Sequence, residues 1–171
     1  MNSVFFLQID KMSKISAKKI IIVLGVILVL IQFYQPETNM GNSLGENDIT
    51  HTLAVPENVM QILKTSCFDC HSNHTDYPWY SKIQPIGIWL ANHVNEGKRE
   101  LNFSEFNNYK AKRKRHKLEE LLKEIKEHEM PLSSYTIIHK NAILSNEQAK
   151  LLINWADSAY QLIPLDSNKH K

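Results

Sequence analysis

Residues 67–71 read Cys67-Phe68-Asp69-Cys70-His71, and the rest of the fold must be built around this stretch. Two thiols three positions apart can each add to a vinyl group on one porphyrin edge, and the next imidazole then lies beneath the iron. The stretch predicts one covalently attached haem c, with thioether bonds to Cys67 and Cys70 and with His71 as the proximal metal ligand. These are the only two cysteines among the 171 residues, so attachment uses every thiol.

Two other interpretations of the cysteine pair stay open. A structural zinc site can begin with these thiols and add His71 and His74, but tetrahedral zinc sites usually bring a second ligand pair from elsewhere. The later histidines are scattered singly. A thioredoxin-like redox pair is expected beside a βαβ pattern, and no alternating apolar pattern surrounds this pair. Haem attachment is therefore the favoured interpretation.

The composition fits one globular domain with appendages. A chain of 171 residues has room for about one domain of ordinary size. Charged residues make up 22% and apolar residues 43%, which excludes a disordered chain and a multi-span membrane protein. The net charge of +2 is too small to indicate nucleic-acid binding, so no nucleic acid is expected among the partners.

A charge-free apolar run, Ile20 to Tyr34 (IIIVLGVILVLIQFY), follows four lysines between residues 11 and 19. A basic segment followed by an apolar run is the layout of an export signal. We expect residues 1–19 to be a cytoplasmic basic region and residues 20–34 to be an uncleaved signal anchor, a transmembrane helix with the rest of the chain outside. A cleaved signal peptide stays open, as does a translation start at Met12 in place of Met1.

The rest of the chain divides by composition. Residues 35–52 contain two of the five glycines and few large apolar side chains, which is typical of a flexible linker. Residues 53–164 carry the apolar periodicity of a globular domain and contain the haem motif, so they are the expected haem-binding domain, and residues 165–171 form a short polar tail. Within 53–164 only two glycines occur and no alternating strand pattern is found, so the sequence predicts an all-α fold.

About four helices are expected around the haem, in a cytochrome c-like arrangement. Apolar residues recur at helical spacing over four stretches: Pro56 to Lys64, Pro85 to Glu96, Ser104 to His128 with a bend before Lys112, and the residues after Ser145. The stripe expected to be buried on the third helix is Leu118, Leu121, Leu122 and Ile125.

Start and stop signals set the expected helix ends. Ser104 is a good N-cap for the third helix. Ser145, with Gln148 three residues later, predicts a capping box for the last helix. Gly97 is the expected stop of the second helix, and Pro131 that of the third.

The distal ligand of the iron is sought after the haem motif. Met130 is the only methionine that follows the motif, and Pro131 behind it favours an extended backbone at Met130. A distal thioether raises the reduction potential and fills the coordination sphere, so Met130 is the predicted second metal ligand. Methionine is also a common core filler, and His93 is the rival ligand. His74 lies too near the motif and His128 at a polar helix end, which makes both weaker candidates.

Five short motifs in order resemble a known family. They are Cys67 to Asn73 (CFDCHSN), Pro78-Trp79-Tyr80, Leu101 to Ser104 (LNFS), Glu129 to Leu132 (EMPL) and Tyr135. The stretch from Val55 to Tyr160 is similar to the small bacterial haem-binding domain family related to c-type cytochromes. The resemblance implies a monohaem, mostly helical domain, often exported and membrane-anchored, with Cys67, Cys70, His71 and Met130 in the roles given above. Pro78-Trp79-Tyr80 stands where soluble cytochromes c of the mitochondrial type carry a Gly-Pro-rich loop, so their partner surface is not transferred.

Two further groups of residues have candidate roles. The aromatic side chains that can wall the haem and donate hydrogen bonds to its propionates are Trp79, Tyr80, Trp89 and Tyr135. Ordinary core packing is their alternative role. The run Lys110 to Lys117 (KAKRKRHK) can dock an acidic partner or anionic lipid head groups, or form a solvated helix face.

The favoured function is that of a one-electron carrier, because fixed His71 and Met130 ligands keep the iron coordination unchanged between oxidation states. The alternative is a haem enzyme or sensor, peroxidase-like or binding a diatomic gas, which needs an open distal position with polar groups beside it. The single CxxCH favours the carrier, and no enzymatic activity is assigned. We expect a single-pass protein of the bacterial cytoplasmic membrane, with its haem domain on the periplasmic side and redox proteins as partners.

Overall fold

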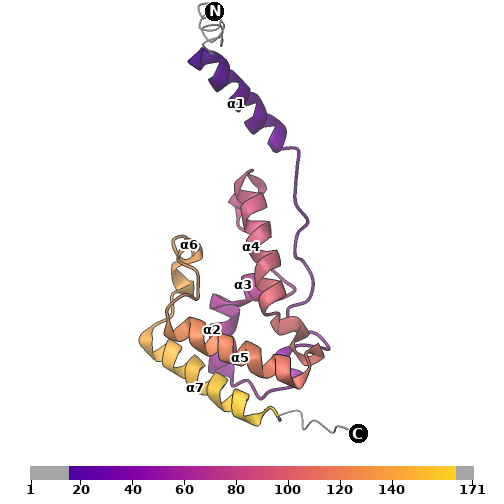
Figure 1. The fold of residues 1–171 in the computed structure, drawn as a ribbon, viewed down its shortest axis with the longest axis vertical. Helices are drawn as coiled ribbons and strands as arrows, with labels where there is room; N and C mark the ends of the chain where they lie inside the picture. The colour runs from indigo at the N-terminus through magenta and orange to yellow at the C-terminus, as the bar shows by residue number, and fades with distance from the viewer. Residues whose placement is uncertain (1–15, 165–171) are drawn as a thin grey trace, which may run out of the picture.

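The computed structural model describes residues 16–164, and within them every regular element is helical (Figure 1). The longer helices are α1 (Ala17–Ile31), α2 (Glu57–Ser66), α4 (Ile86–Glu100), α5 (Ala111–Lys126) and α7 (Asn146–Leu162). The shorter elements are η1 (Ile49–His51), α3 (Phe68–His71), η2 (Trp79–Lys82), η3 (Phe103–Asn108), α6 (Ser133–Thr136) and η4 (Lys140–Ala142). The predicted all-α class is confirmed.

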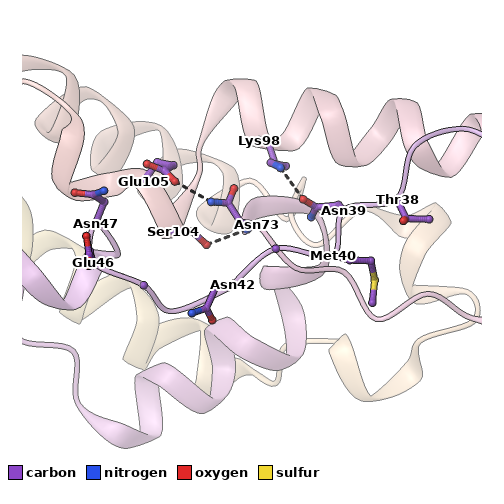
Figure 2. Close-up of a pocket in the computed structure, with 12 residues that line it drawn as sticks. Thr38, Asn39, Met40, Asn42, Glu46, Asn47, Asn73, Lys98, Ser104 and Glu105 are labelled. Carbon is purple, nitrogen blue, oxygen red and sulfur yellow. Dashed lines mark hydrogen bonds between the residues drawn. The ribbon is translucent and has the colours of Figure 1, made fainter.

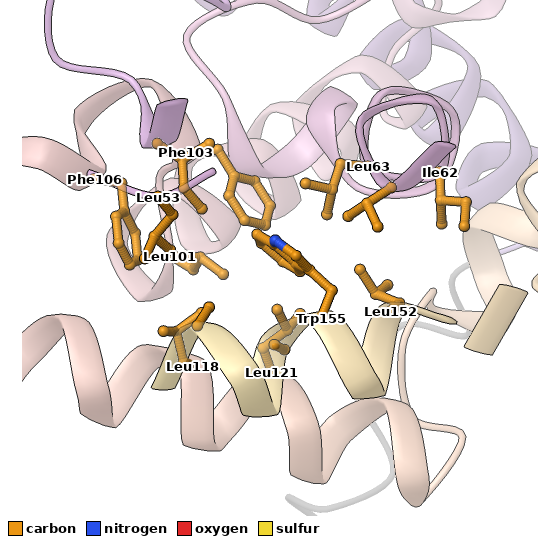
Figure 3. Packing of buried hydrophobic residues seen from close by; sticks show 14 of the residues in the cluster. Leu53, Ile62, Leu63, Leu101, Phe103, Phe106, Leu118, Leu121, Leu152 and Trp155 are labelled. Atoms are coloured by element: carbon orange, nitrogen blue, oxygen red, sulfur yellow. The ribbon is translucent and has the colours of Figure 1, made fainter. Parts of the chain in front are cut away.

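The core is built where α2, α5 and α7 meet. α5 and α7 lie side by side, and α2 packs against α7 (Figure 1). Figure 3 shows the ring of Trp155, on α7, surrounded by three side chains from other elements: Leu63 of α2, Phe103 of η3 and Leu121 of α5. The indole N–H of Trp155 donates a hydrogen bond to the carbonyl oxygen of Ala54 at 3.1 Å, so its polar atom is satisfied. The predicted stripe of α5 is buried as expected: Leu118, Leu121, Leu122 and Ile125.

The structure corrects the prediction at Gly97. α4 does not stop there but continues to Glu100. A Cβ at residue 97 would lie 2.6 Å from the Cys70 carbonyl oxygen, closer than real Cβ atoms come. Gly97 is therefore a packing glycine, which lets α4 approach the Cys67–His71 turn, and the helix ends where Leu101 becomes extended.

The ends of the third and last helices differ in how well the signals predicted them. Ser104 does not cap a long helix, because it lies inside η3, where its amide donates to Asn102 Oδ1 at 3.0 Å. α5 starts later, at Ala111, and the bend expected before it is η3. The chain leaves α5 through His128, whose φ is 59°. The capping box between Ser145 and Gln148 is present as predicted.

Residues 35–52 are not a free tether in the structure. Ile49 is fully buried in the core, and Asp48 caps η1 by accepting from the amide of Thr50 at 2.8 Å. The Asn39 side chain donates to the carbonyl oxygen of Ser72 at 2.9 Å and accepts from Lys98 Nζ at 2.6 Å. Figure 2 shows this segment across a polar pocket, where its side chains meet those of the domain. Composition missed these contacts because they are polar and come from single residues.

The N-terminal helix is short and uncovered. α1 has 15 residues and no buried side chain. At 1.5 Å per residue it is about 22 Å long, less than the ~30 Å of a bilayer's hydrocarbon core. Among the described helices, none combines the length and the apolar character needed to cross a membrane. The structure therefore does not support the spanning helix predicted at 20–34, while residues 1–15, with both candidate start positions, and the tail at 165–171 lie outside the described residues.

Candidate functional site

A cavity of about 450 Å³ opens beside the Cys67–His71 turn. Its walls come from this turn, from the C-terminal half of α4, from α5 and from the loop after α5. Pockets of about 300–1,000 Å³ are typical of small-molecule and cofactor sites. The size and position of the cavity therefore make it the candidate functional site.

One helical turn brings both thiols and the imidazole to this cavity. The amides of Cys70 and His71 donate to the Cys67 carbonyl oxygen at 3.2 Å and 2.9 Å, which closes the turn. Both cysteines are free, and both line the cavity together with His71. The turn lies directly against α4 because Gly97 has no side chain to hold the two apart.

The ring of His71 is held by the backbone in a defined orientation. Its Nδ1 lies 2.9 Å from the carbonyl oxygen of Leu101. A carbonyl only accepts, so Nδ1 is the donor and Nε2 keeps the lone pair that a metal can bind. Backbone hydrogen bonds of this kind orient metal-ligating histidines in general. Burial lowers the pKa of His71, although the hydrogen bond to Leu101 acts in the opposite direction. The lowered pKa favours the neutral ring that a metal ligand must have.

The thiols are protonated at neutral pH. Burial raises the pKa of Cys67 to about 12 and that of Cys70 to about 11, and the negative charge of a neighbouring group adds to each shift. A redox-active pair has a lowered thiol pKa instead. Within residues 16–164 no group of three or more His, Cys, Asp or Glu side chains is placed to hold a metal ion. Neither the thioredoxin-like nor the zinc interpretation gains support from the described residues.

Two of the predicted distal ligands reach the same cavity. Met130 lines it from the loop after α5, where the amides of Glu129 and Met130 donate to the carbonyl oxygen of Glu124 at 2.9 Å and 3.3 Å. His93 lines it from α4, with its Nδ1 3.0 Å from the carbonyl oxygen of Trp89. His74 and His128 do not line it. Of the four candidate ligands, Met130 and His93 are the ones that line this cavity.

A family described as a haem-binding domain matches residues 26–158, well over half of the chain. The chain belongs to this haem-binding domain family. Neither the curated proteins nor the solved structures contain a match. The predicted resemblance is confirmed.

The residues that line the cavity fit a haem. Two thiols, an imidazole with a free Nε2 lone pair and a thioether line one cavity, which is the donor set that a c-type haem uses. Phe103 closes the wall behind His71, with the two rings edge to face at 6.4 Å between centroids. The fit rests on this arrangement as well as on the family.

One of the four predicted wall aromatics lines the cavity, and it is Tyr135. Its hydroxyl donates to Asp69 Oδ2 at 2.6 Å, and its ring stacks on His139 at 4.2 Å between centroids. Asp69, which sequence reasoning left without a role, also accepts from the amide of Asp76 at 3.0 Å. The signal for Asp69 was its place inside the haem motif, next to Cys70.

Trp79, Tyr80 and Trp89 do not line the cavity, so their place in a haem wall stays a prediction. The cavity borders α4 from His93 to Glu100, whereas these aromatics belong to η2 and the first turn of α4. Tyr80 touches the site indirectly, because its hydroxyl lies 3.1 Å from Nε2 of His139, on which Tyr135 stacks. The two tryptophans are exposed.

An ion cluster around the buried Lys117 forms the α5 side of the cavity. Lys117 Nζ lies 3.2 Å from Glu100 Oε2 and 2.5 Å from Glu120 Oε2, and all three residues line the cavity. Burial alone would lower the pKa of Lys117, but the hydrogen bonds to Glu120 and Glu100 outweigh it and raise the pKa. Sequence reasoning saw Lys117 only as the end of a basic run, because its partner Glu100 lies on another helix.

Several side chains of the basic run Lys110 to Lys117 form hydrogen bonds with other parts of the domain. Arg115 donates to the carbonyl oxygens of Tyr160 and Ile163 at 2.9 Å and 2.8 Å, at the C-terminal end of α7. Lys114 donates to Thr52 Oγ1 at 3.0 Å. Lys110 and Lys112 are exposed. These contacts explain why so many cations gather in one stretch of α5.

Proposed function

We propose that this domain carries one haem c, bonded through Cys67 and Cys70 and ligated on its proximal side by His71. The observation that supports this most is that both thiols and the imidazole line one cavity, with Nδ1 of His71 bonded to Leu101. Bound haem supplies an iron that changes its charge by one electron. The chain supplies the two attachment points, the axial ligand and a wall that limits the access of water.

Met130 is the distal ligand in this proposal. Its loop is held by two hydrogen bonds to Glu124, which limits how far the thioether can move when the iron changes charge. A thioether opposite an imidazole raises the reduction potential. His93 is the competing ligand, because it lines the same cavity from α4.

The function that follows is one-electron transfer between redox proteins. Ligands held by a closed turn, a backbone hydrogen bond and a tied loop favour a small change in geometry on reduction. The cavity itself is lined by four glutamates, Glu96, Glu100, Glu120 and Glu124. A docking point for an acidic redox partner therefore lies away from the cavity in this proposal, and exposed Lys110 and Lys112 offer one.

A haem enzyme or sensor is the second candidate function. The observation that favours it is that His93 and Tyr135, two polar side chains, line the cavity. Polar groups beside a displaceable distal ligand are what a peroxidase-like or gas-binding site requires. Rapid binding of peroxide or carbon monoxide by the wild-type protein would select this function over electron transfer.

The proposal places the domain outside the bacterial cytoplasmic membrane, on its periplasmic side. The support is the basic and apolar layout of the first 34 residues, which is typical of an export signal. Whether the segment stays attached to the membrane is tested by N-terminal sequencing of the mature protein. A sequence that begins near Gln35 would contradict retention.

The ligand assignment is tested by comparing Met130→Ala with His93→Ala in the haem-loaded protein. Met130→Ala should abolish the weak red absorption band that marks sulfur coordination of ferric iron, lower the reduction potential and open the iron to cyanide. His93→Ala should change none of these. The reverse pattern would replace Met130 by His93 as the distal ligand.

A further inference from the structure

Four large apolar side chains at one end of the domain are exposed. They belong to η2 and the start of α4, and are Trp79 (77% exposed), Ile83 (43%), Ile86 (43%) and Trp89 (45%). We call this surface the apolar tip. Residues 78–92 contain no acidic residue, and Lys82 is their one charge. Contiguous exposed apolar surface on a folded domain marks an interaction site.

A glutamine latch joins the apolar tip to the end of α1. Gln32 Nε2 donates to the Gln84 carbonyl oxygen at 3.0 Å, and the Gln84 amide donates back to Gln32 Oε1 at 3.0 Å. Gln35 accepts from Gln84 Nε2 and donates to the Lys82 carbonyl oxygen, both at 3.3 Å. Gln84 is 2% exposed, so its own hydrogen bonds are partly shielded from water, whereas the bond from Gln35 to Lys82 is exposed. The latch fixes where α1 leaves the domain.

The apolar surface continues from the tip onto α1. Residues 20–34 carry no charge, and the large apolar side chains from Ile20 to Leu30 are all exposed, from Ile20 at 47% to Ile21 at 68%. Figure 1 shows the end of α4 that bears the tip as the part of the domain nearest to the C-terminal end of α1. One occupant that covers both a tip rich in tryptophan and a helix without charge after Lys19 is a lipid bilayer.

We propose that the apolar tip lies on the surface of a lipid bilayer, with Trp79 and Trp89 in the interfacial layer and α1 inserted beside them. Tryptophan is enriched at this depth because its ring is apolar and its N–H needs a wet partner. Insertion of α1 to interfacial depth suffices, so the proposal does not require the helix to cross the membrane. Lys82 at the tip and Lys18 and Lys19 in the first turn of α1 can pair with anionic head groups.

This contact would set the distance of the haem site from the membrane. The cavity borders α4 from His93 to Glu100, on the half of the helix away from the tip. At 1.5 Å per residue, these positions lie roughly 10–20 Å along the helix from Ile86. The proposal concerns the tip and does not depend on how haem is held, so the two can fail separately.

The first experiment uses the full chain labelled with 5-fluorotryptophan and bound to nanodiscs of phosphatidylcholine and phosphatidylglycerol. The chain has three tryptophans, and buried Trp155 is an internal control for Trp79 and Trp89. Adding lipids with a nitroxide in the upper acyl chain should broaden the ¹⁹F signals of Trp79 and Trp89 and leave that of Trp155 sharp. Equal behaviour of all three signals would overturn the proposal.

The second experiment measures partition of the full chain into vesicles of the same lipids. Trp79→Ser with Ile86→Ser should lower the partition coefficient about tenfold, because two apolar side chains no longer enter the interface. Leu162→Ser is the control, since Leu162 is 75% exposed at the far end of α7 (Figure 1) and should leave partition unchanged. Circular dichroism checks that each variant is folded. If a variant is not folded, the fluorine measurement on the unsubstituted chain tests the proposal in its place.

Two outcomes would assign the tip to another occupant. Wild-type partition equal to that of the Trp79→Ser, Ile86→Ser variant would remove the bilayer as the partner. A dimer that forms without lipid and is lost in the same variant would show that a second copy of this chain covers the tip. Either result would overturn the proposal.

Discussion

Replacing Gly97 by alanine tests how closely α4 must approach the haem-attachment turn. A Cβ at this position would lie 2.6 Å from the Cys70 carbonyl oxygen and 3.1 Å from Cys70 Cβ. Neither atom can rotate away, because one is backbone and the other is bonded to it. Overpacking of this kind costs about 1–3 kcal/mol, while Gly→Ala inside a helix gains about 0.8–1 kcal/mol. The expected net result is a loss of about 1 kcal/mol in the free energy of unfolding.

Thermal unfolding of the full chain, followed by far-ultraviolet circular dichroism, measures this effect. A loss of that size lowers the melting temperature by about 2–4 °C in a domain of this length. Asn95→Ala is the matched control, because Asn95 is exposed on the same helix and its replacement should raise stability by a few tenths of a kcal/mol. A Gly97→Ala variant as stable as the wild type, or more stable, would show that Gly97 is only a poor helix former and that the close approach is not required.

Three further substitutions have defined outcomes. Burial, with the Asp69 carboxylate beside it, raises the pKa of Tyr135 above its ordinary value of 10.0. Because the folded state favours the neutral phenol, the free energy of unfolding should fall as the pH rises above about 10. Tyr135→Phe should flatten this fall, as measured by urea titrations at several pH values. Arg115→Met should destabilise the domain by about 1–2 kcal/mol and speed amide exchange in the last turn of α7, because two carbonyl oxygens lose their donor; exposed Lys112→Met should do neither. Gln84→Ala removes the acceptor for the Ile88 amide and part of the glutamine latch, and should speed amide exchange at 86–89, whereas exposed Gln61→Ala should not.

The helices were predictable where local chemistry alone determines them. The capping box at Ser145 and the leucine stripe of α5 are both present, because each depends on residues within a few positions of one another. The haem motif was predictable for the same reason, since its spacing places both thiols and His71 on one turn. Met130 was predicted as a ligand from its position after the motif; the structure brings it to the same cavity, and its ligation of iron stays a prediction.

The errors arose where a residue's role depends on a distant segment. Gly97 has the composition of a stop signal, but its contact is with Cys70, 27 positions away in sequence. Trp79 and Trp89 were predicted for the haem wall by residue type alone; the cavity borders the other half of α4, and their role stays a prediction. Asn39 lies in a polar segment without periodicity, and its hydrogen bonds to Ser72 and Lys98 carry no local sequence signal.

The intact mass of the exported protein under denaturing conditions tests the central claim most directly. Thioether bonds survive denaturation, so the wild-type chain should carry the added mass of one haem, and this mass should be absent from a Cys67→Ala, Cys70→Ala variant. His71→Ala should keep the covalent mass but change the absorption spectrum, because attachment and ligation are separate. A wild-type chain of unmodified mass whose haem is removed by denaturation would contradict covalent attachment through Cys67 and Cys70.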